Sequence, residues 1–343
     1  MNDLQINRES KPEHVPQAEG PAPSSAPNFA AAAAPSYART LFLGPDGLRS
    51  GWGFAFYVLA FLVLQRLTNS WVADWVRVSP RMSLRVSDAL FEFAGLVSAV
   101  IPAIVLAGVE KRPWGSYGLP LRRSFGKPFW MGAIWGFISI SALIASLYGL
   151  HDFNFGRMVL HGLRIPKFAA YWSAMFLLVG LFEEFLLRGY TQFTLARGIG
   201  FWPAAVALSI SFGLIHLGNE DERWPGMLAA ACIGLFFCLT LRRTGTLWFA
   251  VGFHAAWDWG ESFFYSVPDS GLPAPGHLLN SSLHGSVWLT GGSVGPEGSV
   301  LCFLVLALVW IAFDRVYPAA SALAGNRHSS GLHASGVGKN QIG

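Results

Sequence analysis

The stretch PFWMGAIWGFISISALIASLYGLH, residues 128–151, contains no Asp, Glu, Lys or Arg. It exceeds the ~20 mostly apolar residues that an α-helix needs to cross the hydrocarbon core of a bilayer. Other stretches also lack these four residue types, although the shorter ones must extend past a flanking charge to span: residues 50–65, 93–109, 168–182, 198–219, 224–241, 244–257 and 298–313. The sequence therefore predicts an all-α, polytopic membrane helix bundle of about eight transmembrane helices.

The amino-acid composition supports a membrane protein. Of the 343 residues, 52% are hydrophobic and 13% are charged, whereas globular domains average about 25% charged residues. Mean hydropathy is +0.42. These values exclude a disordered or fibrous protein, and a soluble enzyme needs a more polar surface. The net charge of +4 comes without a basic cluster that contains interleaved aromatic residues. We therefore expect no nucleic-acid partner.

The two ends of the chain differ from its apolar middle. Residues 1–40 are rich in Pro, Ala and Ser, and residues 318–343 are rich in Gly and Ser. Such segments cannot bury a core, so we expect a disordered N-terminal tail and a flexible C-terminal tail around a transmembrane domain at 41–317. Lys and Arg are about twice as frequent on one side of the expected spans as on the other. This bias predicts a protein of the bacterial inner (plasma) membrane with both termini in the cytoplasm.

Two stretches are expected to lie at the membrane edge. Residues 270–296 are uncharged but rich in Gly and Pro, which favours a loop, re-entrant at most, because exposed irregular backbone is not tolerated in lipid. The sequence GGSVGPEG at 291–298 is expected to line the mouth of an active-site cavity. Residues 69–89 mix tryptophan with three arginines, a composition typical of an interfacial segment.

Three short motifs place ionisable side chains in or beside the apolar stretches, where such groups are costly and indicate function. They are FEEFLLRG at 182–189 with Glu183, Glu184 and Arg188, FGLIH at 212–216 with His216, and HAAWD at 254–258 with His254 and Asp258. Residues four apart share a helix face, so Glu184 can pair with Arg188 and His254 with Asp258. Two imidazoles and several carboxylates suffice for hydrolysis by an activated water.

The motifs can meet only if their helices carry them to the same depth. At 1.5 Å per residue, the second and third motifs lie roughly 22 and 18 Å from the starts of their helices. A helix that ended at Arg188 would leave Glu183 only about 7 Å deep, whereas one that continues to residue 197 places it at about 21 Å. We therefore predict one long helix over roughly 168–197, with Arg188 inside the bundle and paired to Glu184.

In this order the motifs resemble those of the CPBP (Abi) family of intramembrane proteases, which includes type II CAAX prenyl endopeptidases and bacteriocin-processing or immunity proteins. The family pattern EExxxR, FxxxH and HxxxN or HxxxD is met at 183–188, 212–216 and 254–258, and the resemblance covers about residues 90–317. It implies an enzyme among membrane lipids that hydrolyses a peptide bond of a membrane-associated protein or peptide. The sequence does not identify that substrate, its prenylation or the oligomeric state.

The resemblance also implies a role for each motif. Glu183, with His216, would hold and deprotonate the attacking water. His254, with Asp258, would stabilise the oxyanion, and the pair of Glu184 and Arg188 would support Glu183. Position 258 departs from the eukaryotic CAAX enzymes, which have Asn there. Because an ionised Asp cannot donate a hydrogen bond to an oxyanion, Asp258 must be protonated, orient His254 or bind a metal.

The sequence does not decide whether the protein uses Zn²⁺ as a cofactor or has no cofactor. Glu183, His216, His254 and Asp258 are candidate metal ligands by residue type. No HExxH helix is present, and the family that the chain resembles has been described both as metalloproteases and as metal-independent glutamate proteases. The missing HExxH helix weighs slightly against a tightly bound metal.

Other classes of function fit part of the pattern. A non-catalytic membrane scaffold or bacteriocin-immunity protein could share the fold, and buried charges could form a proton path in a transporter. A transporter is expected to show internal repeats, and none is detected. No Gly-x-Ser-x-Gly is present, and Cys232, Cys238 and Cys302 lie in apolar runs, so we expect them in the core. Glu92 also lies in a span, where we expect at most a buried hydrogen bond. Four loop histidines are expected to have no role: His151, His161, His277 and His284.

Overall fold

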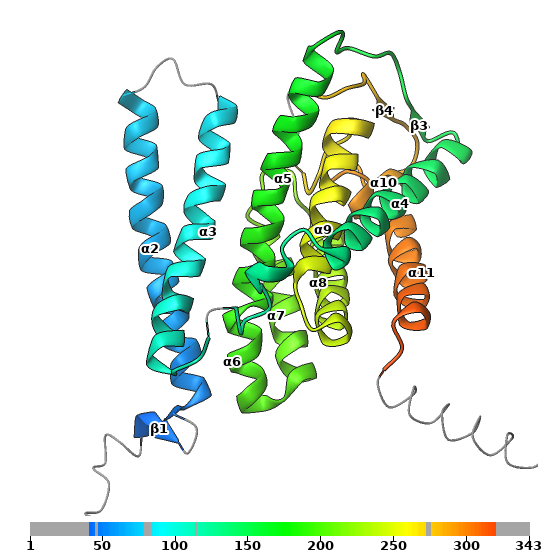
Figure 1. The fold of residues 1–343 in the computed structure, drawn as a ribbon. Coiled ribbons are helices and arrows are strands. Elements are labelled where there is room, and N and C mark those ends of the chain that lie inside the picture. The colour runs from blue at the N-terminus through cyan, green and yellow to red at the C-terminus, as the bar shows by residue number, and fades with distance from the viewer. Residues whose placement is uncertain (1–40, 45–46, 79–83, 114, 272–275, 320–343) are drawn as a thin grey trace, which may run out of the picture. The chain divides into compact units, whose positions relative to one another are not determined.

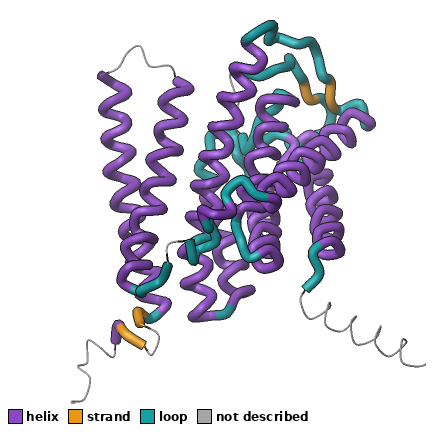
Figure 2. Tube along the Cα trace, viewed as in Figure 1, coloured by secondary structure: helices purple, strands orange, loops and turns teal. Residues whose placement is uncertain are grey.

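The structure, a computed structural model, describes residues 41–44, 47–78, 84–113, 115–271 and 276–319. The tails expected at 1–40 and 318–343 lie outside these residues, except for the first two residues of the second. The described chain is mostly helical (Figures 1 and 2), which confirms the all-α bundle. Its long helices are α2 (Ser50–Val78), α3 (Leu84–Val109), α4 (Lys127–Gly149), α5 (Arg164–Arg188), α6 (Tyr190–Ile199), α7 (Phe201–His216), α8 (Trp224–Thr244), α9 (Trp248–Asp258) and α11 (Val300–Val316).

Short elements connect these helices. A π-helix (Trp259–Tyr265) continues α9, and α10 (Val287–Thr290) lies in the loop before α11. Two antiparallel pairs, β1 (Leu43–Gly44) with β2 (Gly47–Leu48) and β3 (Phe153–Asn154) with β4 (Ser282–Leu283), are each two residues long per strand. Single 3₁₀ turns occupy Leu121–Arg123 and Pro296–Gly298. Most of 276–296 is loop, as its Gly and Pro content predicts.

Five helical segments of the described chain are long and apolar enough to cross a membrane: Ser50–Val78, Val86–Val109, Lys127–Gly149, Arg164–Ile199 and Trp224–Thr244. The remaining predicted spans fall on α7, α9 and α11, which have 16, 11 and 17 residues. These are shorter than a span of ~20 residues, so the count of eight stays a prediction. Residues 69–78 continue α2, residues 79–83 lie outside the described residues, and residues 84–89 begin α3. The interfacial location of 69–89 stays a prediction.

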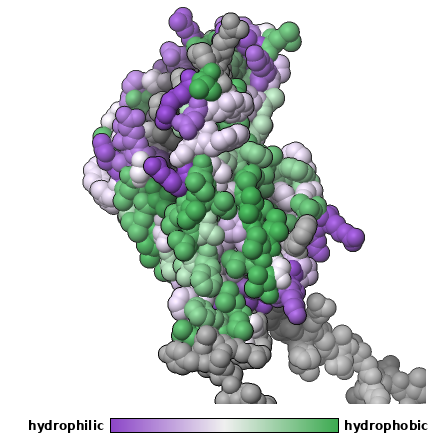
Figure 3. Space-filling view, turned by 90° about the vertical axis from the view of Figure 1, so that its left-hand side faces the viewer, coloured by the Kyte–Doolittle hydropathy of each residue, from purple (hydrophilic) through white to green (hydrophobic). Residues whose placement is uncertain are grey.

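The outer faces of several helices are apolar. On α2, Leu59, Val63 and Leu67 follow one another at four-residue spacing, and each is more than half exposed. The same spacing of exposed apolar residues recurs on three other helices: Trp130, Ile134 and Ile138 of α4, Val206, Ile210 and Leu214 of α7, and Val300, Leu304 and Leu308 of α11. Figure 3 shows apolar side chains gathered across the middle of one face, with polar ones above them. Such continuous apolar faces fit lipid rather than water, as expected of an integral membrane protein.

The long helix predicted over 168–197 is present as α5 and α6, interrupted at one residue. Gly189 has φ −80° and ψ −124°, outside the helical region, while its N–H still bonds to Phe185 O at 2.9 Å. A Cβ at this position would overlap Phe185 O, which explains the glycine. The chain resumes its helix at Tyr190, so Glu183 lies well inside the segment Arg164–Ile199.

Glycines bring α4 and α9 into close contact. A Cβ on Gly132 would overlap Phe249 O, one on Gly136 would overlap Phe253 O, and one on Gly252 would overlap Phe129 O. Small residues at four-residue spacing allow the backbones of membrane helices to approach this closely. Consequently α9 is enclosed, with every residue from Trp248 to Phe253 buried, and its position relative to α4 is fixed by direct backbone packing.

Candidate active site

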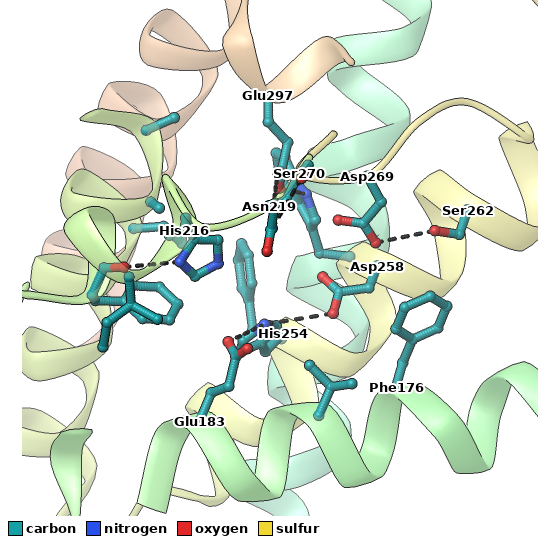
Figure 4. A pocket seen from close by; sticks show the side chains of 18 of the residues that line it. Phe176, Glu183, His216, Asn219, His254, Asp258, Ser262, Asp269, Ser270 and Glu297 are labelled. Atoms are coloured by element: carbon teal, nitrogen blue, oxygen red, sulfur yellow. Dashed lines mark hydrogen bonds and ion pairs between the residues drawn. The ribbon is translucent and has the colours of Figure 1, made fainter. Parts of the chain in front are cut away.

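A cavity of about 510 Å³ lies between α3, α5, α7, α8, α9 and the loop that precedes α11. Its walls are apolar and aromatic for much of their area, with Trp172, Phe176 and Phe212 among the lining residues. Four of the six predicted site residues also line it: Glu183, His216, His254 and Asp258. Figure 4 shows these four side chains converging on the same space from three helices. The structure thus brings the three sequence motifs together.

The other two predicted residues form a buried ion pair behind the cavity wall. Arg188 Nη1 donates to Glu184 Oε1 at 3.1 Å, and both side chains have no exposed surface. The predicted pairing is therefore confirmed. The guanidinium lies 4.3 Å from the centroid of the Phe212 ring, and a Cβ on Gly234 would overlap Arg188 Nη2. The glycine on α8 leaves room for the arginine, and the aromatic face adds a cation–π contact.

Glu184 also holds His254. Its Oε1 lies 3.0 Å from His254 Nδ1, so a carboxylate already paired with Arg188 accepts the Nδ1 proton. A hydrogen bond at one ring nitrogen determines which face of an imidazole is available for other contacts. Gly180, one turn before Glu184, packs closely against α9, because a Cβ there would lie 3.2 Å from Val251 O. His254 is therefore oriented from α5, although it belongs to α9.

The second nitrogen of His254 turns toward two other carboxylates. His254 Nε2 lies 3.6 Å from Glu183 Oε2 and 3.5 Å from Asp258 Oδ2 (Figure 4). Asp258 thus faces the cavity side of the ring, while the orienting position at Nδ1 is taken by Glu184. Glu183 is the most exposed of this group, with a quarter of its side-chain surface accessible.

His216 stands on another wall of the same cavity. Its Nδ1 lies 2.8 Å from the backbone oxygen of Phe212. Because a carbonyl oxygen only accepts, Nδ1 carries a proton in this bond and Nε2 is left for other partners. The Phe212 ring lies between the two histidines, with centroids 4.4 Å from His216 and 6.4 Å from His254.

Several cavity residues were not predicted from the sequence. Asp88 and Glu92 of α3, and the loop residues Asn219, Asp269, Ser270 and Glu297, all line it. Glu92 Oε2 is buried without a hydrogen-bond partner among the described residues, so no buried hydrogen bond is seen at that oxygen. Of the 291–298 stretch expected at the cavity mouth, Glu297 lines it. No Lys or Arg is among its described lining residues, and the cavity is therefore acidic.

The four loop histidines lie away from the cavity lining, and the three cysteines differ in burial. None of the four loop histidines lines the cavity. Cys238 and Cys302 are buried as predicted, but Cys232 is exposed; the prediction that it belongs to the core was wrong, because it lies on the outer side of α8. All three cysteines are free thiols.

A further group of acidic side chains lies in the π-helix after α9 and in the loops beside the cavity. Within the described part of the chain, one group of three potential metal-ligating side chains has its ligand atoms within 4.8 Å of one another: Glu261, Asp269 and Glu297. Burial, and then the nearby carboxylates of Asp258 and Glu297, raise the pKa of Asp269 well above its ordinary value. Glu222, in the loop before α8, has its pKa raised mainly by burial, while the N–H of Arg223 opposes this.

This helical bundle brings carboxylates and imidazoles together around one cavity, and these are the groups that hydrolysis by an activated water needs. Residues 165–260 match the family model described as type II CAAX prenyl endopeptidase Rce1-like. The match contains all six motif residues and confirms the resemblance to CPBP family intramembrane proteases. At the level of the family, it supports an endopeptidase that works among membrane lipids on a protein or peptide substrate. Searches of curated proteins and of solved structures gave no match.

Proposed function

We propose that this chain is a CAAX-type processing protease, which hydrolyses a peptide bond of a membrane-associated protein or peptide by activating a water at Glu183. The observation that carries this proposal is the contact of Glu183 Oε2 with His254 Nε2 at 3.6 Å, inside a cavity that His216 also lines. A general base, two imidazoles and an apolar cleft for the peptide are the groups that such a hydrolysis needs.

In the proposed reaction, a water lies between Glu183 and His216. His216 Nε2 accepts one hydrogen bond from it, since Nδ1 already donates to Phe212 O. The water oxygen attacks the peptide carbonyl carbon while its proton passes to Glu183, and the carbonyl electron pair moves onto oxygen. His254 Nε2–H stabilises that oxyanion. Collapse breaks the C–N bond, and Glu183 returns the proton to the leaving amine.

Asp258 is assigned to the same oxyanion. Its Oδ2 lies on the Nε2 side of His254. Because Glu184 already binds Nδ1 and orients the ring, we assign Asp258 a different role. As a carboxylic acid, Asp258 would donate the hydrogen bond that an Asn amide donates in the eukaryotic CAAX enzymes. Asp258→Asn should then retain cleavage, whereas Asp258→Ala should lose it. If Asp258→Asn is as inactive as Asp258→Ala, the carboxylate itself is required and this assignment is wrong.

The experiment uses the purified full-length protein in lipid nanodiscs with two probes, a farnesylated CAAX peptide and the same peptide without its prenyl group. Glu183→Gln and His216→Ala should each lower kcat/KM by about 10²–10⁴-fold, the usual contribution of a general acid–base group. Glu220→Gln is the matched control, because Glu220 is an exposed acid in the loop after α7. Undiminished cleavage by Glu183→Gln would refute the proposed base.

The proposal includes the site of action. We place the protein in the bacterial plasma membrane with both termini in the cytoplasm, on the excess of Lys and Arg in the loops assigned to that side. Labels attached at the N-terminus and at the loop after Gly149 should be accessible from opposite sides of intact cells. Accessibility from the same side would refute this topology.

A further inference from the structure

Three carboxylates next to the candidate active site form a compact cluster. Glu261 lies in the π-helix that continues α9, Asp269 follows it in the loop, and Glu297 lies in the 3₁₀ turn before α11. One oxygen from each lies within 4.8 Å of the other two. Asp269 and Glu297 line the cavity wall, while Glu261 is fully buried behind it. Segments separated by more than 30 residues thus present three negative charges to one point.

Glu261 differs from the other two in its hydrogen bonding within the described part of the chain. Its side chain has 0% exposed surface, and neither of its two carboxylate oxygens has a hydrogen-bond partner among the described residues. The neighbouring donor Trp257 Nε1 bonds to Glu297 Oε1 instead, at 2.8 Å. A buried carboxylate without hydrogen bonds is strongly unfavourable unless it is neutralised or coordinates a cation. Its position also falls in a π-helix, an element found mostly at functional sites.

The other two carboxylates accept hydrogen bonds from neighbouring side chains, and each bonded oxygen keeps a second lone pair for a cation. Ser262 Oγ donates to Asp269 Oδ2 at 3.0 Å, and Ser270 Oγ donates to Glu297 Oε2 at 2.6 Å. Hydrogen bonds of this kind orient ligating carboxylates in metal sites. Asp269 and Glu297 are thus held by neighbouring side chains, while no described Lys or Arg lines the cavity to neutralise the carboxylates.

We propose that Glu261, Asp269 and Glu297 bind a calcium ion, which fastens the loop before α11 to the π-helix end of α9. An all-oxygen carboxylate set suits a hard cation rather than Zn²⁺. Ca²⁺–oxygen distances are about 2.3–2.6 Å, so ligand atoms across one ion are separated by up to about 5 Å. The ligand atoms all lie within 4.8 Å of one another, so they can share one such ion. Ca²⁺ accepts an irregular set of carboxylates, whereas Mg²⁺ demands near-ideal octahedral geometry.

The site would act through the position of α9. The π-helix that carries Glu261 begins directly after Asp258, so an ion held there ties the cavity-side end of α9 to the loop that closes the cavity. The proposal does not depend on peptidase activity, and its readouts are binding and stability.

The test uses full-length protein in detergent, treated with EGTA and then titrated with CaCl₂ or MgCl₂. Isothermal titration should show one Ca²⁺ bound per chain with higher affinity than Mg²⁺, and the Tm should rise with Ca²⁺ concentration. Glu261→Gln should abolish this rise. Ser262→Ala should weaken Ca²⁺ binding by about tenfold, as loss of an outer-shell partner does. Glu220→Gln, with its exposed side chain, should bind Ca²⁺ like the parent.

Two outcomes overturn the proposal. One is a flat titration with an unchanged Tm for the parent protein, which would mean that the three carboxylates share protons instead of a cation. The other is a Ca²⁺ response that survives in Glu261→Gln or disappears in Glu220→Gln, which would indicate nonspecific binding to surface acids.

Discussion

Replacing Glu184 by Gln tests the buried ion pair at the back of the candidate active site. Glu184 Oε1 and Arg188 Nη1 are 3.1 Å apart, and neither side chain is exposed. At an effective dielectric constant of about 20, Coulomb's law gives roughly 5 kcal/mol for two charges at that distance. Removing one partner of a buried pair leaves the other charge uncompensated, which typically costs about 3–5 kcal/mol. Because Arg188 keeps its contact with the Phe212 ring, we expect a loss of about 3 kcal/mol in the free energy of unfolding.

The matched control removes both charges together. Glu184→Gln combined with Arg188→Met leaves no unpaired ion, and replacing a buried pair by groups of similar volume is often neutral. The double variant should therefore regain most of the lost stability. Equilibrium unfolding in mixed micelles of increasing SDS content, applied to both single variants and the double variant, yields the coupling energy. If the double variant is no more stable than Glu184→Gln, electrostatic pairing is not what stabilises this region.

The same variants separate stability from catalysis. In the double variant the residue at 184 can still accept from His254 Nδ1, at the position where Oε1 now lies 3.0 Å away, but without a negative charge. Since a carboxylate at Nδ1 stabilises a charged imidazole, peptide cleavage should stay reduced although stability has recovered. Full activity in the stable double variant would show that Glu184 serves only as the partner of Arg188.

Three further predictions concern packing, a distant polar cluster and pH. Gly136→Leu should prevent α4 from approaching α9, because even a Cβ would overlap Phe253 O. The yield of folded protein should therefore fall. Gly149→Leu should be tolerated, because Gly149 lies in open space on the same helix. Glu110→Ala should lower the free energy of unfolding by about 3 kcal/mol in a thermal or SDS unfolding assay. The Glu110 side chain is 1% exposed and accepts hydrogen bonds from Tyr190, at 2.7 Å, and from two arginines. Unchanged stability would contradict this prediction. The pKa of Glu222 is raised by burial, so the folded state holds that proton to higher pH than the unfolded state does. Stability should fall as pH rises from the ordinary pKa of the carboxyl, about 4.3, to its raised folded value. Glu222→Gln should flatten the dependence of Tm on pH in that window. An unaltered dependence would refute the assignment of this effect to Glu222.

The motif residues could be found from the sequence because charges are scarce in apolar stretches. In a chain with 13% charged residues, an ionisable group inside a span stands out, and four-residue spacing is enough to predict that Glu184 meets Arg188. The depth of Glu183 followed in the same way from helix rise per residue. Only the interruption at Gly189 was missed, since glycine alone does not show whether a helix bends.

The acidic part of the cavity could not be found in this way. Asp269 and Glu297 lie in a long loop, where charged residues are ordinary, and Glu261 is one residue among many after the last motif. Their convergence depends on how the loop returns over the end of α9. Sequence spacing contains no information about such a return, because loop conformation is set by contacts with the finished bundle.

The sequence by itself determined the membrane class, most of the helices and six candidate site residues, because apolar run length and helical periodicity are local properties of the chain. The tertiary structure decided which of those residues contact one another. It placed Glu184 on His254 Nδ1 and left Nε2 to Glu183 and Asp258, and it gathered Glu261, Asp269 and Glu297. Both arrangements join different segments of the chain. The contacts of His254 form only when the bundle has packed, because they depend on the glycine contacts that bring α9 against α4 and α5.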